Sequence, residues 1–80
     1  MFDDILSKIN NYKLHEQLML LASRRNVNEE QIEYITSLIN RYDMDWSSFL
    51  GNVMINRVNG VVYRNLNGIS GIPKYVSYFL

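Results

Sequence analysis

The stretch of sequence that decides the fold runs over residues 28–55 and reads NEEQIEYITSLINRYDMDWSSFLGNVMI. Asn28 is a strong N-cap, because its side-chain oxygen can accept a hydrogen bond from a backbone N–H of the first helical turn, and a Gln three residues later can complete a capping box. Asp45 can cap a second helix in the same way, by accepting from the backbone N–H of Ser47 or Ser48. The sequence therefore predicts one helix that begins after Asn28 and another that begins after Asp45.

Apolar side chains follow each cap at intervals that place them on one stripe of a helix. After the first cap they are Ile32, Ile35, Leu38, Ile39 and Tyr42, and after the second they are Trp46, Phe49, Leu50, Val53, Met54 and Val58. Each helix is expected to bury its stripe and to expose its other faces. Gly60 is expected to end the second helix.

The same spacing occurs upstream of this stretch. Apolar side chains recur at Phe2, Ile5, Leu6, Ile9, Leu14, Leu18, Leu21 and Ala22. Asn10 and Asn11 interrupt the pattern, and Asn is unfavourable inside a helix because its side chain competes for backbone hydrogen bonds. We therefore expect either one helix with a weak centre or two helices that meet near Asn11.

Residues 61–72 are compatible with two structures. They can form a short helix closed by Gly68, or a strand that enters a type I′ hairpin at Asn67-Gly68. The helix is favoured, because the second strand of the hairpin would be short and weakened by Gly, and two isolated strands are only marginally stable. Pro73 then suits the first position of a last helix, residues 73–80.

Composition limits the fold and the function. The 80 residues have the size of one domain, and 48% hydrophobic and 20% charged residues with zero formal net charge are typical of a globular protein. The sequence contains no Cys, which excludes a disulfide scaffold and thiolate chemistry. Residues 1–80 are thus expected to form a single all-α domain, a small bundle of four to five short helices.

No segment of the sequence resembles a membrane span or an export signal. The longest apolar run, Leu18 to Ala22, is five residues long, whereas a spanning helix needs about 20. The N-terminus is acidic where a secretory signal would be basic. A cytoplasmic location without membrane contact is the expectation.

The carboxylates Asp43 and Asp45 are the one pair with a catalytic spacing, because two such groups on a strand can hold Mg²⁺. Here they lie between two expected helices, and Asp45 is needed as a cap, so we interpret the pair as linker and cap. His15 has no second His at the spacing of a zinc motif. No catalytic, cofactor-binding or metal-ligating residue is predicted in this chain.

The arginines could suggest an RNA-binding face. The chain contains Arg24, Arg25, Arg41, Arg57 and Arg64 together with six Tyr. Guanidinium groups and phenol rings can stack on bases, but the eight acidic residues and zero net charge argue against such a face. Solvated Arg and half-buried Tyr are the preferred interpretation.

The C-terminal segment is expected to be an interaction surface. Its residues are Tyr75, Val76, Tyr78, Phe79 and Leu80. Because termini are usually polar and exposed, such an apolar end either docks as the last piece of the core or indicates that the chain is the N-terminal segment of a longer protein. The expected partner is the remainder of that polypeptide, or a second copy of the chain.

The second half of the sequence resembles a known family. The matching text is Asp45-Trp46-Ser47-Ser48-Phe49-Leu50, then Asn56-Arg57-Val58-Asn59-Gly60-Val61-Val62-Tyr63-Arg64-Asn65-Leu66, then Ile72-Pro73. It resembles the N-terminal helical region of a family of uncharacterised bacterial nucleotidyltransferase-like proteins. The first half agrees with that region only as amphipathic helices, and Arg57 stands where the family usually has His.

This resemblance implies a helical lead-in to a polymerase-β-like catalytic domain, which would transfer a nucleotidyl group with the help of carboxylate-bound Mg²⁺. The catalytic elements of the family come later than this region, so the nucleotide and Mg²⁺ are implied only for the longer protein. The expected function is therefore a non-catalytic region that packs against a catalytic domain or presents substrate to it. The alternative is a stand-alone, self-associating helical interaction module.

Overall fold

The computed structural model describes residues 2–80, with side chains from Asp4 onward. This part of the chain is all-α, as expected, and contains no strand. Its helices are α1 (Phe2–Ile9), α2 (Leu14–Ala22), α3 (Glu29–Arg41), α4 (Trp46–Ile55), α5 (Asn59–Leu66) and α6 (Lys74–Phe79). Six helices within residues 2–80 is one more than the largest number expected, because the N-terminal segment forms two helices.

The break between α1 and α2 is stabilised locally. The backbone N–H of Lys13 donates to Glu16 Oε1 at 3.1 Å, and Gln17 Nε2 donates to the carbonyl of Tyr12 at 2.8 Å. These side chains thus pair with a backbone N–H and a backbone carbonyl just before α2, which would be paired within the helix if α1 and α2 were continuous. The side chain of Phe2, expected on the apolar stripe, lies outside the described residues.

Both predicted N-caps are confirmed. Asn28 Oδ1 accepts from the backbone N–H of Gln31 at 2.9 Å, and Gln31 Oε1 accepts from the backbone N–H of Asn28 at 3.2 Å. This reciprocal pair is a complete capping box. At α4, Asp45 Oδ1 accepts from the backbone N–H of Ser48 at 3.1 Å.

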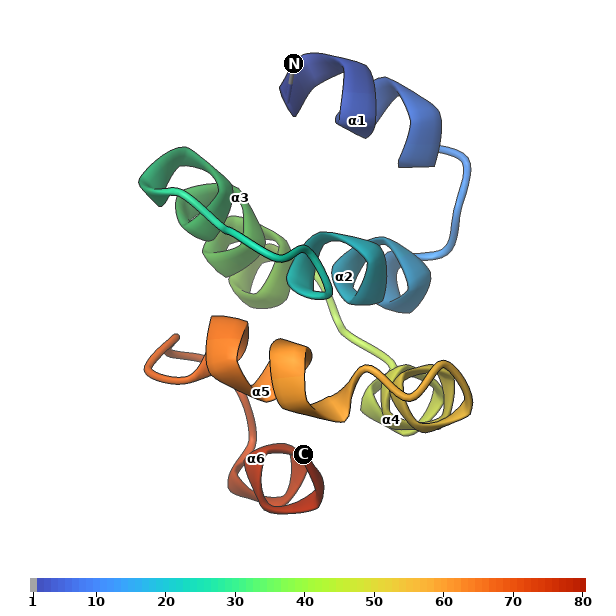
Figure 1. The fold of residues 1–80 in the computed structure, drawn as a ribbon, viewed down its shortest axis with the longest axis vertical. Coiled ribbons are helices and arrows are strands. Elements are labelled where there is room, and N and C mark those ends of the chain that lie inside the picture. The colour runs from blue at the N-terminus through green and yellow to red at the C-terminus, as the bar shows by residue number, and fades with distance from the viewer. Residues whose placement is uncertain (1) are drawn as a thin grey trace.

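The helices pack around α2 and α4. Helix α2 contacts α3, α4 and α5, and α4 also contacts α5 and α6. Helices α1 and α3 lie toward one end of the longest axis and α4, α5 and α6 toward the other (Figure 1). The Cα radius of gyration, 11.5 Å, is that of a compact chain of this length.

Every helix contributes to one core. The buried apolar residues are Ile9, Leu18, Leu21, Ala22, Ile35, Leu38, Ile39, Phe49, Val53, Val62, Leu66 and Val76. Three residues that were predicted to be buried on these stripes are exposed, namely Ile32, Tyr42 and Met54. Spacing places a residue on a face, but the helices packed against that face decide how much of it is covered.

Helix α5 is tied to the C-terminal end of α2. Asn65 Nδ2 donates to the carbonyls of Ala22 and Arg24, both at 2.7 Å, and Arg64 Nη2 donates to the carbonyl of Arg25 at 2.5 Å. These carbonyls lie just beyond or at the last turn of α2, where no intrahelical N–H is available to them. The side chains of α5 therefore cap a helix more than 40 residues earlier in the chain.

Helix α4 ends earlier than expected, at Ile55 rather than at Gly60. The N–H of Val58 donates to the carbonyl of Val53 and the N–H of Arg57 to that of Met54, both at 3.2 Å. This pair of bonds is a Schellman motif, which needs a left-handed residue and usually uses Gly. Here Arg57 occupies that position with φ of 56°.

Replacing Arg57 with Gly is therefore expected to stabilise the domain. A residue with a Cβ is destabilised by roughly 1–2 kcal/mol in the left-handed region, and Gly avoids this cost. Part of the resulting gain is offset, because Gly has a greater conformational entropy in the unfolded state. The expected net gain in the free energy of unfolding is about 0.5–1 kcal/mol, measured by urea denaturation. The left-handed conformation costs even more for a β-branched side chain, so Arg57→Val is expected to lower the free energy of unfolding. A decrease in the free energy of unfolding for Arg57→Gly would contradict this account.

Residues 59–66 form a helix, as favoured over the hairpin, and the chain then reaches α6 through two glycines with positive φ, Gly68 at 90° and Gly71 at 96°. Pro73 precedes α6 as its N-cap, with ψ of 145°, rather than standing inside its first turn. At Gly71 the connector lies against α3, where Asn40 Nδ2 donates to the carbonyl of Ser70 at 3.2 Å. A Cβ at Gly71 would overlap the Asn40 side chain, whereas a Cβ at Gly68 would meet nothing.

These two glycines make a matched pair of substitutions. Gly68→Ala should cost about 1 kcal/mol of unfolding free energy, from the backbone conformation alone. Gly71→Ala should cost about 2–3 kcal/mol, because the Asn40 side chain must also move and its hydrogen bonds weaken. Thermal and urea denaturation of both variants would measure the difference, and equal losses would show that Asn40 does not constrain the connector.

Candidate interaction surface

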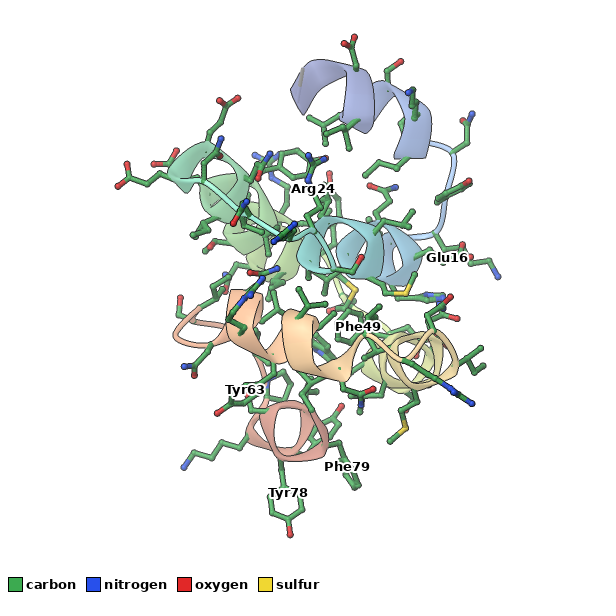
Figure 2. The ribbon with its side chains drawn as sticks, in the orientation of Figure 1. Glu16, Arg24, Phe49, Tyr63, Tyr78 and Phe79 are labelled. Atoms are coloured by element: carbon green, nitrogen blue, oxygen red, sulfur yellow. The ribbon has the colours of Figure 1, made fainter. Side chains whose placement is uncertain are left out.

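Helix α6 presents an exposed aromatic face. Tyr75, Tyr78 and Phe79 are 52%, 87% and 55% exposed, and their spacing of three and four residues places them on one side of the helix. The rings of Tyr78 and Phe79 meet edge to face, with centroids 5.8 Å apart. Figure 2 shows Tyr78 and Phe79 pointing away from the body of the molecule, at the end opposite α1.

Two of the five residues expected on this surface have other positions. Val76 is fully buried and belongs to the core, and Leu80 is partly buried against it. A helix turns by about 100° per residue, so adjacent residues cannot all face solvent. Val76 is the buried contact that holds α6 against the bundle, and this is what leaves Tyr75, Tyr78 and Phe79 outside.

Neighbouring helices add further exposed apolar side chains. Met54 and Ile55 at the end of α4 are 52% and 79% exposed, and Tyr63 on α5 is 45% exposed. Tyr63, Tyr78 and Phe79 lie toward the same end of the molecule in Figure 2. We call the exposed large apolar residues of α4, α5 and α6 the apolar end; they are Met54, Ile55, Tyr63, Tyr75, Tyr78 and Phe79. Sequence patterns missed Met54, Ile55 and Tyr63, because Met54 fell on a core stripe and the other two were not singled out.

The charge of the molecule is also unevenly distributed. All eight acidic residues precede Trp46, whereas residues 46–80 contain Arg57, Arg64 and Lys74 and no Asp or Glu. Helices α4, α5 and α6 are built from this acid-free part and lie together at one end (Figure 1). Within α4, α5 and α6 themselves every charged residue is therefore basic, a property that the zero net charge of the whole chain conceals.

Asp43 and Asp45 lie in the connection between α3 and α4, where Asp45 is the N-cap of α4. Both are exposed, and Asp45 is engaged by Ser48, whose Oγ donates to Asp45 Oδ2 at 2.7 Å. The hydrogen bonds from the Ser48 side chain and backbone lower the pKa of Asp45 below its ordinary value. Among residues 2–80 with described side chains, no group of three or more His, Cys, Asp or Glu is placed to hold a metal ion.

Arg24, Arg25 and Arg64 lie near one another, where α5 meets the end of α2. Arg64 is engaged with the carbonyl of Arg25, while Arg41 lines a shallow pocket on α3 with Tyr34, Ser37, Leu38 and Tyr42. Arg24 lies on the side of α2 that faces away from Tyr78 (Figure 2).

No helix within the described residues has the length and apolar composition needed to cross a membrane. Comparison of the sequence with protein-family models and with curated proteins, and of the fold with solved structures, gave no match.

Proposed function

We propose that this chain is a non-catalytic helical interaction domain, the N-terminal region of a nucleotidyltransferase-like protein, and that it packs against a catalytic domain lying outside residues 1–80. The observation that carries the proposal is the apolar end. Its aromatic rings and Met54 belong to the residue types enriched at protein interfaces. Tyr78 is 87% exposed, so the fold of the isolated domain buries little of its side chain.

The attachment of α6 supports the same proposal. The helix has six residues and buries only Val76 among them, and a helix this short is not stable by itself. A partner that covers Tyr75, Tyr78 and Phe79 would bury the remaining apolar face. Binding of this partner would therefore stabilise α6 and form the interface at the same time, because both result from burying the same apolar side chains.

The charges indicate what the partner looks like. Because Arg57, Arg64 and Lys74 are the only charged residues in the α4–α6 part, a partner with an apolar centre and an acidic rim would be complementary. The sequence resemblance implies that the partner is a catalytic domain. That domain would then bind any nucleotide and Mg²⁺. The helices of this chain would either pack against the domain or present substrate to it.

Self-association through the same surface is the alternative function. The exposed edge-to-face pair of Tyr78 and Phe79 would suit a symmetric aromatic contact. A two-fold interface places the same residues of both copies against each other, so it would also bring together like positive charges. This repulsion favours the catalytic domain over a second copy.

Two measurements test the proposal. The nucleotide sequence downstream of the Leu80 codon should continue in frame into a Gly-Ser turn and a strand with spaced carboxylates, and a stop codon there would refute the catalytic-domain partner. In the protein that this frame encodes, amide hydrogens of residues 75–80 should exchange more slowly than in the 80-residue chain. Tyr78→Ser should remove that protection, whereas Tyr12→Ser, at a 51% exposed tyrosine outside the apolar end, should not.

Sedimentation of the 80-residue chain separates the alternative. A sharp dimer that Tyr78→Ser dissociates would indicate the self-associating module, while a monomer or weak, polydisperse association agrees with an uncovered interface. A rise in melting temperature on addition of Mg²⁺-ATP would instead indicate a nucleotide site within these residues, and would contradict a non-catalytic role.

A further inference from the structure

Two Asn-Gly pairs occur in the chain, and they lie in different backbone environments. Asn59-Gly60 opens α5, and Asn67-Gly68 follows its last residue. A Gly after an Asn leaves its own backbone nitrogen unhindered, because no side chain shields it. The nitrogen can then attack the side-chain amide carbon of the Asn, provided that the backbone between the two residues can rotate.

No hydrogen bond within the described residues restrains the peptide group between Asn67 and Gly68. Both residues are exposed, with φ and ψ of −61° and 125° at Asn67 and φ of 90° at Gly68. Among the described residues, neither the Asn67 carbonyl nor the Gly68 N–H takes part in a hydrogen bond; the neighbouring bond of this turn joins the Ile69 N–H to the Leu66 carbonyl. The space around the Gly68 Cα is also open.

The peptide group between Asn59 and Gly60 is held. Both residues belong to α5, whose first turn is closed by the bond from the Val62 N–H to the Val58 carbonyl at 2.9 Å. Rotation about this peptide would break the helical geometry of the first turn. Asn59 therefore serves as an internal comparison with the same dipeptide sequence.

We propose that Asn67 is a site of spontaneous covalent modification, at which the side-chain amide is converted to a carboxylate through a cyclic imide. The Gly68 backbone nitrogen loses its proton to water and forms a bond to Asn67 Cγ. The bond from Cγ to the side-chain nitrogen breaks, and that nitrogen leaves as ammonia after taking up a proton. One water molecule then opens the imide at either carbonyl, giving aspartate or isoaspartate with no oxidation or reduction.

The product changes the apolar end in two ways. It introduces a carboxylate into residues 46–80, which otherwise contain no acid. When the imide opens to isoaspartate, the backbone gains a methylene group between α5 and α6. The connector is held on α3 by the Asn40–Ser70 bond, so the extra length must alter how α6 and its aromatic face are presented.

The test is peptide mapping by mass spectrometry after incubating the folded chain in mildly alkaline buffer. The peptide containing Asn67 should gain the mass difference between OH and NH₂ about tenfold faster, or more, than the peptide containing Asn59, because reaction at Asn59 is limited to molecules in which the first turn of α5 is open. In denaturant the two rates should become similar. Asn67→Ser should abolish the accompanying acidic shift on ion exchange.

Two results would overturn the proposal. One is equal conversion of Asn59 and Asn67 in the folded chain. The other is an Asn67 that stays intact in the folded chain while the denatured chain converts it. Neither result bears on the partner of the apolar end, which is tested separately by hydrogen exchange of residues 75–80.

Discussion

Phe49→Ala is expected to lower the free energy of unfolding by about 3–5 kcal/mol, measured by urea denaturation followed by circular dichroism. Phe49 is fully buried in α4, the helix that contacts α2, α5 and α6, and it lies at the centre of the molecule in Figure 2. Its ring also meets the edge of Trp46, with centroids 5.5 Å apart. Truncation therefore removes buried apolar area and leaves a cavity where several helices meet.

This loss is large in relation to the domain. At roughly 0.05–0.15 kcal/mol per residue, a chain of 80 residues has a total stability of about 4–12 kcal/mol. Phe49→Ala therefore removes a large share of it, and at the low end of this range it unfolds the chain outright. Phe49→Leu keeps most of the volume and should cost about 1–1.5 kcal/mol, which remains measurable. Phe79→Ala makes the same chemical change at a 55% exposed position and should stay within about 0.5 kcal/mol. Similar losses at both positions would contradict the assignment of Phe49 to the core.

Asn65→Asp is expected to cost about 3 kcal/mol or more at neutral pH, although it changes only one atom group. Asn65 Nδ2 donates to two carbonyls at 2.7 Å. An aspartate would place a negatively charged acceptor against both of them, near the negative end of the α2 dipole. Asn65→Ala, which removes the donor without adding charge, should cost less, about 2 kcal/mol.

The pH dependence of the Asp variant distinguishes repulsion from lost packing. The carbonyls should raise the pKa of the introduced carboxyl in the folded state, so its destabilising effect is present above that pKa and is relieved as the pH falls through it. Relative to Asn65→Ala, the Asp variant should therefore become more stable in acid. Asn67→Asp, at an exposed position two residues later, is the matched control and should stay within about 0.5 kcal/mol. If Asn65→Asp and Asn65→Ala lower the free energy of unfolding equally at every pH, the carbonyls of Ala22 and Arg24 do not repel the introduced carboxylate, and this account would be wrong.

The local signals in the sequence were sufficient for the helices. Asn28 and Asp45 cap the helices they were expected to cap, because a cap depends on groups within three residues of it. The choice of a helix for residues 59–66 was also correct for a local reason, since the alternative lacked an adequate second strand. The predicted end of α4 was wrong. Arg57 occupies the left-handed position that Gly usually occupies at the end of a helix, whereas the sequence pattern indicated the later Gly60.

The candidate surface was predicted only in part. The sequence indicated the C-terminal aromatics, and Tyr75, Tyr78 and Phe79 are exposed, but Val76 is buried. The exposed apolar residues Met54, Ile55 and Tyr63 were not predicted. The absence of acids from residues 46–80 could have been read from the order of the residues, since all acids precede Trp46, but the net charge concealed it.

By itself, then, the sequence determined where helices start, that they are amphipathic and that no strand competes with them, because these properties depend on neighbours in the chain. The tertiary structure decided which side of each helix is covered, that Asn65 caps α2, and that Gly71 must lack a side chain beside Asn40. The last two depend on groups 30 or more residues apart, and the first depends on contacts between different helices. Their proximity results from packing several helices at once, and no local pattern encodes it.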